Sequence, residues 1–519
     1  MPTVQTMHAE KITRAAVLLA LVAALGGAAV PAQAATAAPP NSDFNGDGYN
    51  DLAVGSPHYP GYAGGETSGM VAVLYGGPNG LNGRHILRPQ AGCIGGDHYG
   101  QPQPCSWWGR SLAAADVDAD GRADLLHAGL YDMEVRSWKP LGITAIERRT
   151  HIPNHSAGLA GGQFDDRPGT DIVIGSKPGY GGRIGGWYNR SASYISQAME
   201  NGSHSQIEAA GFGDINGDGR MEAVVVAEKY MIGTGGKEAF LWLLEDLHRS
   251  PLKLTELGAQ ATCTLPPSFG RGCPMRDSKV AVGNVNGDGH PDVVMITPGA
   301  ASLQVWYGSA AGLRRDPGYT ADLSWLAPGA EIGPGLAVGD VDGDGFAEIA
   351  VGASKVAVSG HDEAGAIAVI PGSANGPVLK HSKIITQDGV GSTGDGIPGT
   401  PPPAATPAPD PGRTPVPEPT WDPQPTGTPE PVAGPLPDPI SEQSQAGDHF
   451  GEAVTIIDVT GDGKGEVIVG APAKNGGAGM LTVLRGSGTG VATADAQIVH
   501  PRPVGVTYPQ AAFGLVLLR

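Results

Sequence analysis

A nine-residue pattern that recurs along the chain constrains its fold more than any other feature. Six copies read roughly Asp-x-Asp/Asn-Gly-Asp-Gly-x-x-Asp/Glu and begin at residues 43, 116, 214, 284, 340 and 458. A seventh, degraded copy at 163–171 is recognised by the strand-like sequence Ile172–Ser176 that follows it. Successive copies begin 47 to 73 residues apart, except for a last interval of 118. Repeats of about 40 to 70 residues suit four-stranded propeller blades, so the pattern predicts one large repeat domain.

The long interval contains a proline-rich segment at residues 388–446, whose 59 residues account for the excess. Stretches such as Thr400–Asp410 favour extended polyproline II. Both ends of the segment return to the same propeller, so we expect a disordered surface loop or, alternatively, a glycosylated or wall-threading stalk. The predicted organisation is a signal peptide at 1–34, blades one to six at 35–387, the insertion at 388–446, and blade seven with a ring-closing strand at 447–519.

Short apolar strands flank every copy, as an all-β fold requires. A hydrophobic residue followed by glycine lies eight residues before the loop in several units, as in Trp108-Gly109, Ile332-Gly333 and Phe450-Gly451. The first loop has no such pair ahead of it in the mature chain, but Phe513-Gly514 lies near the C-terminus. We therefore expect Phe513–Arg519 to pair beside Asp51–Gly55, so that both termini build the first blade.

The full signature occurs once, as Phe450-Gly451 followed by Gly470-Ala471-Pro472 with Asp458–Glu466 between them. It resembles the FG-GAP repeat family, the seven-bladed β-propeller at the N-terminus of integrin α chains and in many secreted bacterial proteins. The resemblance implies this all-β fold and bound metal. It says little about activity, because one fold hosts many functions.

The repeated loops carry the chemistry that points to calcium. Calcium takes six to eight oxygen ligands, and side chains at loop positions 1, 3 and 5 can point inward while glycines at 4 and 6 allow the tight turn. Position 7 would add a backbone carbonyl and position 9 a carboxylate, as in a shortened EF-hand loop between strands. The predicted ligands are Asp43, Asn45, Asp47, Tyr49, Asp51; Asp116, Asp118, Asp120, Arg122, Asp124; Asp214, Asn216, Asp218, Arg220, Glu222; Asn284, Asn286, Asp288, His290, Asp292; Asp340, Asp342, Asp344, Phe346, Glu348; and Asp458, Thr460, Asp462, Lys464, Glu466.

The concentration of acidic residues in the loops supports the prediction of bound calcium. The seven loops hold 22 of the 52 acidic residues but only four basic ones, so they carry almost all of the net charge of −19. Without cations, clustered carboxylates would repel one another. We predict about five or six calcium ions, bound most tightly by loops 116–124 and 340–348 and most weakly by 284–292. Loop 163–171 should bind none, because Gln163 and Arg167 stand at positions 1 and 5.

The N-terminus and the cysteines indicate export. Lys11 and Arg14 precede an apolar run and an Ala32-Gln33-Ala34 site, the layout of a signal peptide cut after Ala34. No membrane span is expected after cleavage. Cys93, Cys105, Cys263 and Cys273 allow three pairings, of which the two local ones are favoured by proximity. Asn154, Asn189 and Asn201 begin glycosylation sequons, whose use depends on the host.

The acidic balance excludes nucleic acid as a default partner, since phosphate binding needs a basic face. We expect an exported, monomeric, calcium-binding propeller that presents loops to an extracellular protein or glycan and has no enzymatic activity. The alternative is an extracellular propeller enzyme, a polysaccharide lyase or hydrolase. It would need a Lys, Arg, His or Tyr base in a groove near a metal. The chain contains neither a G-x-S-x-G elbow nor an H-E-x-x-H motif.

Overall fold

The fold was examined in a computed structural model of the chain. It describes residues 42–59, 69–88, 95–96, 102–103, 107–129, 132–139, 142–151, 156–176, 183–187, 195–198, 205–230, 237–249, 252–263, 278–328, 330–389, 432–435, 443–506, 508 and 510–518. The predicted signal peptide, the asparagines of the three sequons and Cys93, Cys105 and Cys273 lie outside these residues. Their roles remain predictions.

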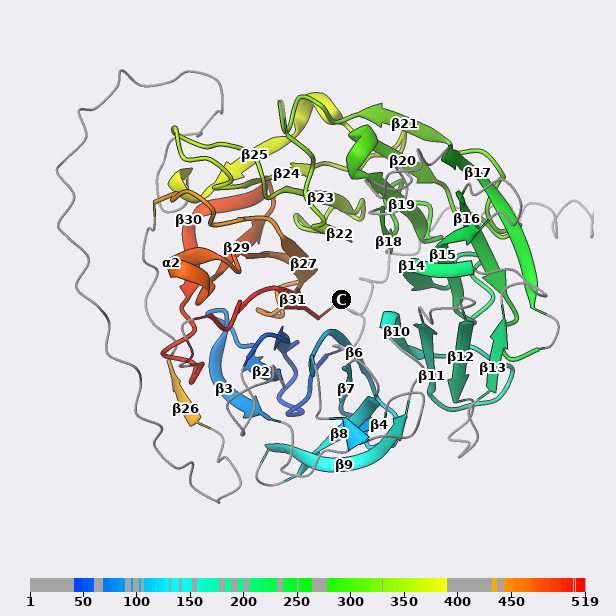
Figure 1. Ribbon diagram of the computed structural model, residues 1–519, viewed down its shortest axis with the longest axis horizontal. Coiled ribbons are helices and arrows are strands. Elements are labelled where there is room, and N and C mark those ends of the chain that lie inside the picture. Colours follow the sequence, from blue (N-terminus) through cyan, green and yellow to red (C-terminus); the bar gives the residue numbers. More distant parts are fainter. Residues whose placement is uncertain are drawn as a thin grey trace, which may run out of the picture. The chain divides into compact units, whose positions relative to one another are not determined.

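The described strands form seven antiparallel sheets arranged as the blades of a ring (Figure 1). Blade one contains β31 (Val516–Leu517), β1 (Leu52–Ser56), β2 (Met70–Tyr75) and β3 (Asn82–Leu87). Blade two contains β6 (Ser111–Ala115), β7 (Asp124–Ala128), β8 (Asp132–Lys139) and β9 (Gly142–His151), and blade three contains β10 (Ser156–Gly162), β11 (Asp171–Ser176), β12 (Arg183–Trp187) and β13 (Ile195–Ala198). Blade four contains β14 (Ser205–Gly213), β15 (Glu222–Tyr230), β16 (Lys237–Glu245) and β17 (Lys253–Cys263).

The remaining blades follow the same order. Blade five contains β18 (Lys279–Gly283), β19 (Asp292–Thr297), β20 (Ser302–Trp306) and β21 (Tyr319–Asp322), and blade six contains β22 (Leu336–Gly339), β23 (Glu348–Ala353), β24 (Ala366–Ile370) and β25 (Lys383–Thr386). Blade seven contains β27 (Ala453–Ile457), β28 (Glu466–Gly470), β29 (Leu481–Ser487) and β30 (Gly490–Val499). Outside the blades lie the β4 (Gly95–Gly96) and β5 (Pro102–Gln103) pair, the single turn α2 (Lys474–Gly477), and the 3-10 turns η1 (Pro298–Ala300), η2 (Leu379–His381) and η3 (Gln387–Gly389).

The C-terminal strand closes the ring, as the sequence predicted. Strand β31 pairs antiparallel with β1, with Val54 opposite Leu517 and Gly55 opposite Val516. Two further bonds fix the strand: Leu518 N–H donates to the Ala53 carbonyl, and Thr455 Oγ1 of blade seven donates to the Leu518 carbonyl. Closure therefore pairs β1, which would otherwise be an unpaired edge strand of blade one, with the C-terminal strand β31.

The hydrophobe-glycine pairs join neighbouring blades. Trp108, Phe450 and Phe513 are buried, and their backbones bridge to Gly69, Gly365 and Gly479 of the adjacent blade. A Cβ on Gly479 would lie within 2.2 Å of the Phe513 carbonyl oxygen, so only glycine permits this approach. Large apolar side chains fill the spaces between sheets, which gives a series of inter-blade cores.

The proline-rich insertion touches the ring at two described places. At its base, Asp388 accepts hydrogen bonds from Ser359 Oγ and from the backbone N–H of Ser444, which joins the points where the chain leaves and re-enters. Farther along, β26 (Val432–Pro435) pairs with β3 at the outer edge of blade one. Among the described residues, no helix is long and apolar enough to cross a membrane.

Ring closure by Phe513 predicts a large effect of its removal. Phe513→Ala should lower the free energy of unfolding by about 3–5 kcal/mol, because a fully buried aromatic ring is lost at the blade junction. Phe513→Leu, which retains most of the apolar volume, should cost less, and deletion of 513–519 should cause aggregation. Denaturant unfolding measures all three. A truncated protein that unfolds like the full chain would contradict closure.

Candidate metal centres

The last residue of each aspartate loop, as we call the seven nine-residue segments, is a buried acid. One of its carboxylate oxygens accepts the backbone N–H of loop position 2 at 2.7–2.9 Å in all seven loops. This bond closes the loop across its base. The seven acceptors are Asp51, Asp124, Asp171, Glu222, Asp292, Glu348 and Glu466, and the donors are Phe44, Val117, Phe164, Ile215, Val285, Val341 and Val459.

Burial makes these position-9 carboxyls costly to ionise. It raises the pKa of Asp51 to about 8, that of Asp124, Glu222, Glu348 and Glu466 to about 7, and that of Asp292 to about 6. Carboxylates elsewhere in the same loop raise these pKa values further, while backbone hydrogen bonds lower them. A divalent cation nearby would favour the ionised form.

The outer part of each loop is organised by its own side chains. Asp43, at position 1, accepts the backbone N–H groups of Gly46, Asp47 and Gly48. In the six regular loops the position-5 carboxylate accepts the N–H of position 7 at 2.9–3.0 Å. Glycines at positions 4 and 6 have φ between +70° and +94°, as predicted, and Ala119 takes the same conformation at +59°. The role of the position-7 carbonyl as a ligand stays a prediction.

Two loops bring three carboxylates within reach of one ion. Ligand oxygens of Asp116, Asp118 and Asp124 lie within 4.8 Å of one another, and so do those of Asp340, Asp342 and Asp344. These are the two loops with four carboxylates each. Their donors are all oxygens, the set that hard divalent cations prefer, so the residues fit such an ion. In the other regular loops, neutral Asn or Thr at position 3 replaces one carboxylate.

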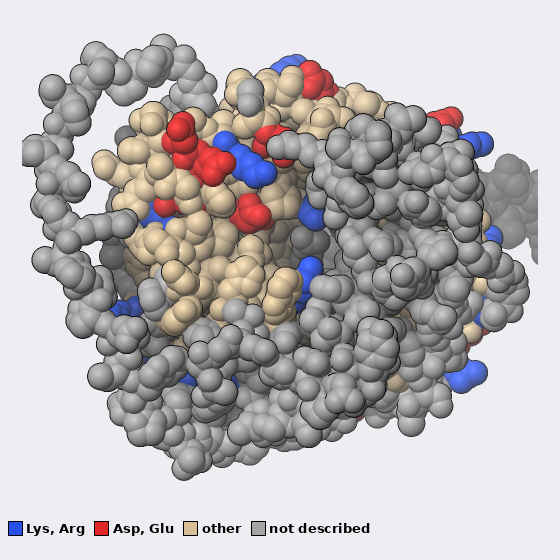
Figure 2. Space-filling model, in the orientation of Figure 1, with Lys and Arg blue, Asp and Glu red and all other residues tan. Residues whose placement is uncertain are grey.

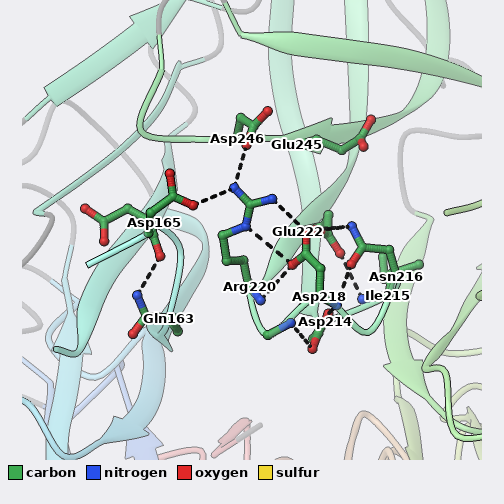
Figure 3. Close-up of polar contacts among 12 residues, drawn as sticks. Gln163, Asp165, Asp214, Ile215, Asn216, Asp218, Arg220, Glu222, Glu245 and Asp246 are labelled. Carbon is green, nitrogen blue, oxygen red and sulfur yellow. Dashed lines mark hydrogen bonds and ion pairs between the residues drawn. The ribbon is translucent and has the colours of Figure 1, made fainter. Parts of the chain in front are cut away.

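The third loop is bridged by the side chain of its first residue. Gln163 Nε2 donates to the backbone carbonyls of Asp165 and Arg167, and Figure 3 shows the first of these bonds. Asp171 still closes the base through the Phe164 N–H. That loop 163–171 binds no calcium stays a prediction. The contacts show that Gln163 supplies donors where five other loops present a carboxylate and the sixth presents the Asn284 amide.

Hydrogen bonds link neighbouring loops into a nearly continuous ring. In four loops the backbone N–H of position 8 donates at 2.7–2.9 Å to the position-1 carbonyl of the preceding loop. Asn50 Nδ2 and Thr170 Oγ1 make the same link with their side chains. At the remaining junction position 8 is Pro291, which has no N–H to donate. The backbone donors are Ala123, Met221, Ala347 and Gly465.

Position-7 side chains, which the sequence analysis considered only for their carbonyls, pack between blades. Five of them lie over the position-4 glycine of the preceding loop, so closely that a Cβ on Gly287 would lie 2.6 Å from the Phe346 ring. The same contact joins Tyr49 to Gly461, Arg122 to Gly46, His290 to Gly217 and Lys464 to Gly343. At the junction of blades three and four, position 4 is Asp166, and Arg220 forms an ion pair with it at 3.0 Å.

The raised pKa values predict a pH dependence of the metal-free protein. A carboxyl whose pKa is higher in the fold than in the unfolded chain stabilises the fold below pH 4, and this stability is lost as pH rises towards 8. With a chelator present, the melting temperature should therefore fall between about pH 5 and 8. A divalent cation should reduce this fall. Calorimetry in both conditions measures it, and a chelated protein whose melting temperature rises across this range would contradict the assignment.

Comparison with known proteins places these loops in a family context. The FG-GAP repeat model matches residues 36–74, 333–370 and 450–484, and the FG-GAP-like repeat model matches 284–351. Integrin alpha-PS5 of Drosophila melanogaster is 29% identical over 149 residues, which cover 27% of this chain and 14% of that protein. Integrin alpha-IIb of Mus musculus is 29% identical over 219 residues, which cover 38% of this chain and 20% of that protein.

The chain thus spans no more than a fifth of the length of these two integrin relatives. Among solved structures, the Dos1 propeller aligns with 59% of this chain and 65% of its own, at 12% identity and a TM-score of 0.33. This likeness is too low to bear on function.

Proposed function

We propose that this β-propeller, which carries FG-GAP repeats and is similar to part of integrin α chains, is an exported, calcium-stabilised protein that binds an extracellular ligand without enzymatic turnover. Calcium is the cation that suits loops of carboxylate and amide oxygens, and we expect five or six ions per chain. The ligand is an extracellular protein or glycan, and the unit that binds it is a monomer.

The two ends of the ring differ in a way that supports ligand binding at one of them. Strand order puts the aspartate loops at one end, because each leads into the second strand of its blade, and in blades two to seven it joins that strand to the first. Connections from the second to the third strand, and from one blade to the next, leave the opposite end. We call it the connection face. In Figure 2 several described acidic side chains lie close together, with basic ones beside them, over the upper left part of the visible face.

The observation that carries the proposal is an exposed tryptophan on the connection face. Trp107 precedes β6, at the end of that strand opposite Asp116, and its exposed fraction is 36%. Its backbone is left-handed, with φ of +60°. His58 contacts the ring edge-on at a centroid distance of 6.0 Å, and the Arg110 guanidinium stacks 4.7 Å from the ring centre. An exposed aromatic ring beside a positive charge is suited to stack on a sugar or to anchor an acidic peptide.

The metal half of the proposal predicts stabilisation by calcium. Each ion that binds only the fold adds about 2.7 kcal/mol at a hundredfold excess over its dissociation constant, so chelation should lower the melting temperature. Asp342→Ala should reduce the calcium-induced shift, whereas Asp165→Ala in the degenerate loop should leave the shift intact. Calorimetry with calcium or chelator measures both variants. An unchanged melting temperature on chelation would show that the loops hold no calcium.

The ligand half predicts that binding depends on Trp107. Mature protein screened on glycans and extracellular matrix components should bind in calcium, and Trp107→Ala should weaken that binding at least about tenfold. Trp325→Ala is the matched control, because Trp325 is an equally exposed tryptophan (37%) after β21 on the same face, and among the described residues no arginine stacks on its ring as Arg110 does on Trp107. Equal losses in the two variants would remove Trp107 from the site. New unsaturated sugar products in a parallel lyase assay would overturn the non-enzymatic function.

A further inference from the structure

Arg220 distinguishes the junction of blades three and four from the other blade junctions. It stands at position 7 of loop 214–222, where five other loops place a side chain over the position-4 glycine of the preceding loop. We propose that the positively charged side chain of Arg220 joins the two blades at this junction without a metal ion. The same charge lowers the affinity of loop 214–222 for a divalent ion. The second part rests on the proposed calcium function.

Three acids from three segments converge on this guanidinium (Figure 3). Arg220 Nη1 lies 3.0 Å from Asp166 Oδ1 of the degenerate loop and 3.0 Å from Asp246 Oδ1 in the turn after β16. Its Nη2 lies 2.6 Å from Asp218 Oδ2, within its own loop. Asp166 is also held by Arg249, whose Nη2 donates to its second oxygen at 3.1 Å. One side chain therefore ties both loops and the β16–β17 turn together.

This network of ion pairs lies at a junction that lacks the packing of a position-7 side chain over a position-4 glycine. Loop 163–171 has no carboxylate at position 1, where Gln163 donates to two backbone carbonyls of the loop. Its position 4 is Asp166 instead of the glycine that receives a neighbouring side chain at five other junctions. An ion pair between Asp166 and Arg220 replaces that packing contact, and it requires no divalent ion.

The same side chain competes with an incoming cation. Asp218 is the position-5 carboxylate of loop 214–222, and Arg220 contacts both of its oxygens, at 2.6 Å from Nη2 and 3.4 Å from Nε. A divalent ion in this loop must share these oxygens with the guanidinium and tolerate its positive charge. A polar cavity beside the loop, lined in part by Asn216, Glu222 and Lys253, gives the displaced side chain room to move.

Arg122 offers a matched control. It occupies the same position 7 in loop 116–124, but in the described part of the chain it lies over Gly46 and forms no ion pair within 4 Å. Removing Arg122 therefore removes an arginine next to an aspartate loop without removing an inter-blade ion pair. Differences between the Arg220 and Arg122 variants isolate the network itself.

The affinity claim is tested by titrating CaCl2 into chelator-stripped mature protein in a calorimeter. Asp218→Ala identifies the binding step that belongs to loop 214–222, since that step disappears. Arg220→Ala should tighten this step roughly three- to tenfold, the range expected for freeing a charge-assisted hydrogen bond. Arg122→Ala should leave it unchanged. A step that is unchanged or weakened in Arg220→Ala would overturn the claim.

The junction claim has a readout that needs no calcium. In chelator, Arg220→Ala should melt below the wild type at about 0.05 M salt, and the gap should narrow at about 0.5 M, because salt screens exposed ion pairs. Arg122→Ala should show a smaller, salt-independent change. If the wild type binds no calcium, the proposed calcium function is wrong. The melting experiment in chelator still tests whether Arg220 joins blades three and four. An Arg220→Ala protein that melts like the wild type at both salt concentrations would overturn it.

Discussion

A buried carboxylate at the end of each aspartate loop is the interaction on which the rest of the structure depends. It accepts the N–H of position 2 in all seven loops, including the one that has lost its outer ligands. In blades one and five, Asp51 and Asp292 also accept the N–H of the glycine after the third strand, so the loop, the second strand and the third strand share one group. Breaking it would leave buried donors without partners, which costs about 1–3 kcal/mol per group.

Around this base the loops have a second layer that is suited to a cation. Positions 1, 3 and 5 present oxygens whose orientation is set by backbone N–H groups of the same loop. A cation would find its ligands largely organised, and it would relieve the repulsion among them. In most loops the position-1 carbonyl accepts a hydrogen bond from the next loop, and the position-7 side chain packs on the preceding loop. Each candidate metal site is therefore in direct contact with its neighbours. The ring of blades and the ring of loops stabilise one another.

Much of this could be predicted from the sequence, because repetition exposes what each position has in common. Blade number, the left-handed glycines, the degenerate third loop and closure by Phe513 all follow from spacing and residue type. The hydrogen bond from the position-2 N–H to the position-9 carboxylate could not be predicted. An Asp or Glu at position 9 is equally suited to accept a buried hydrogen bond and to bind a metal, so the residue type does not distinguish the two roles. Nor could the contact of position 7 with the preceding loop, because it depends on how two blades are placed. Arg220 and Asp166 are 54 residues apart, and sequence alone does not bring them together.

Residue-resolved hydrogen exchange with and without chelator tests the two-layer account most directly. Chelation should speed exchange at outer N–H groups such as Gly46 and Gly48, which are held by Asp43, while the N–H groups of Phe44 and Val285 at the loop base stay protected. The Phe164 N–H of the third loop should exchange at the same rate in both conditions. In this account the position-2 N–H groups are protected without metal, and the outer N–H groups need metal for protection. Chelation that exposes both sets of N–H groups equally, or that exposes neither set, would contradict it.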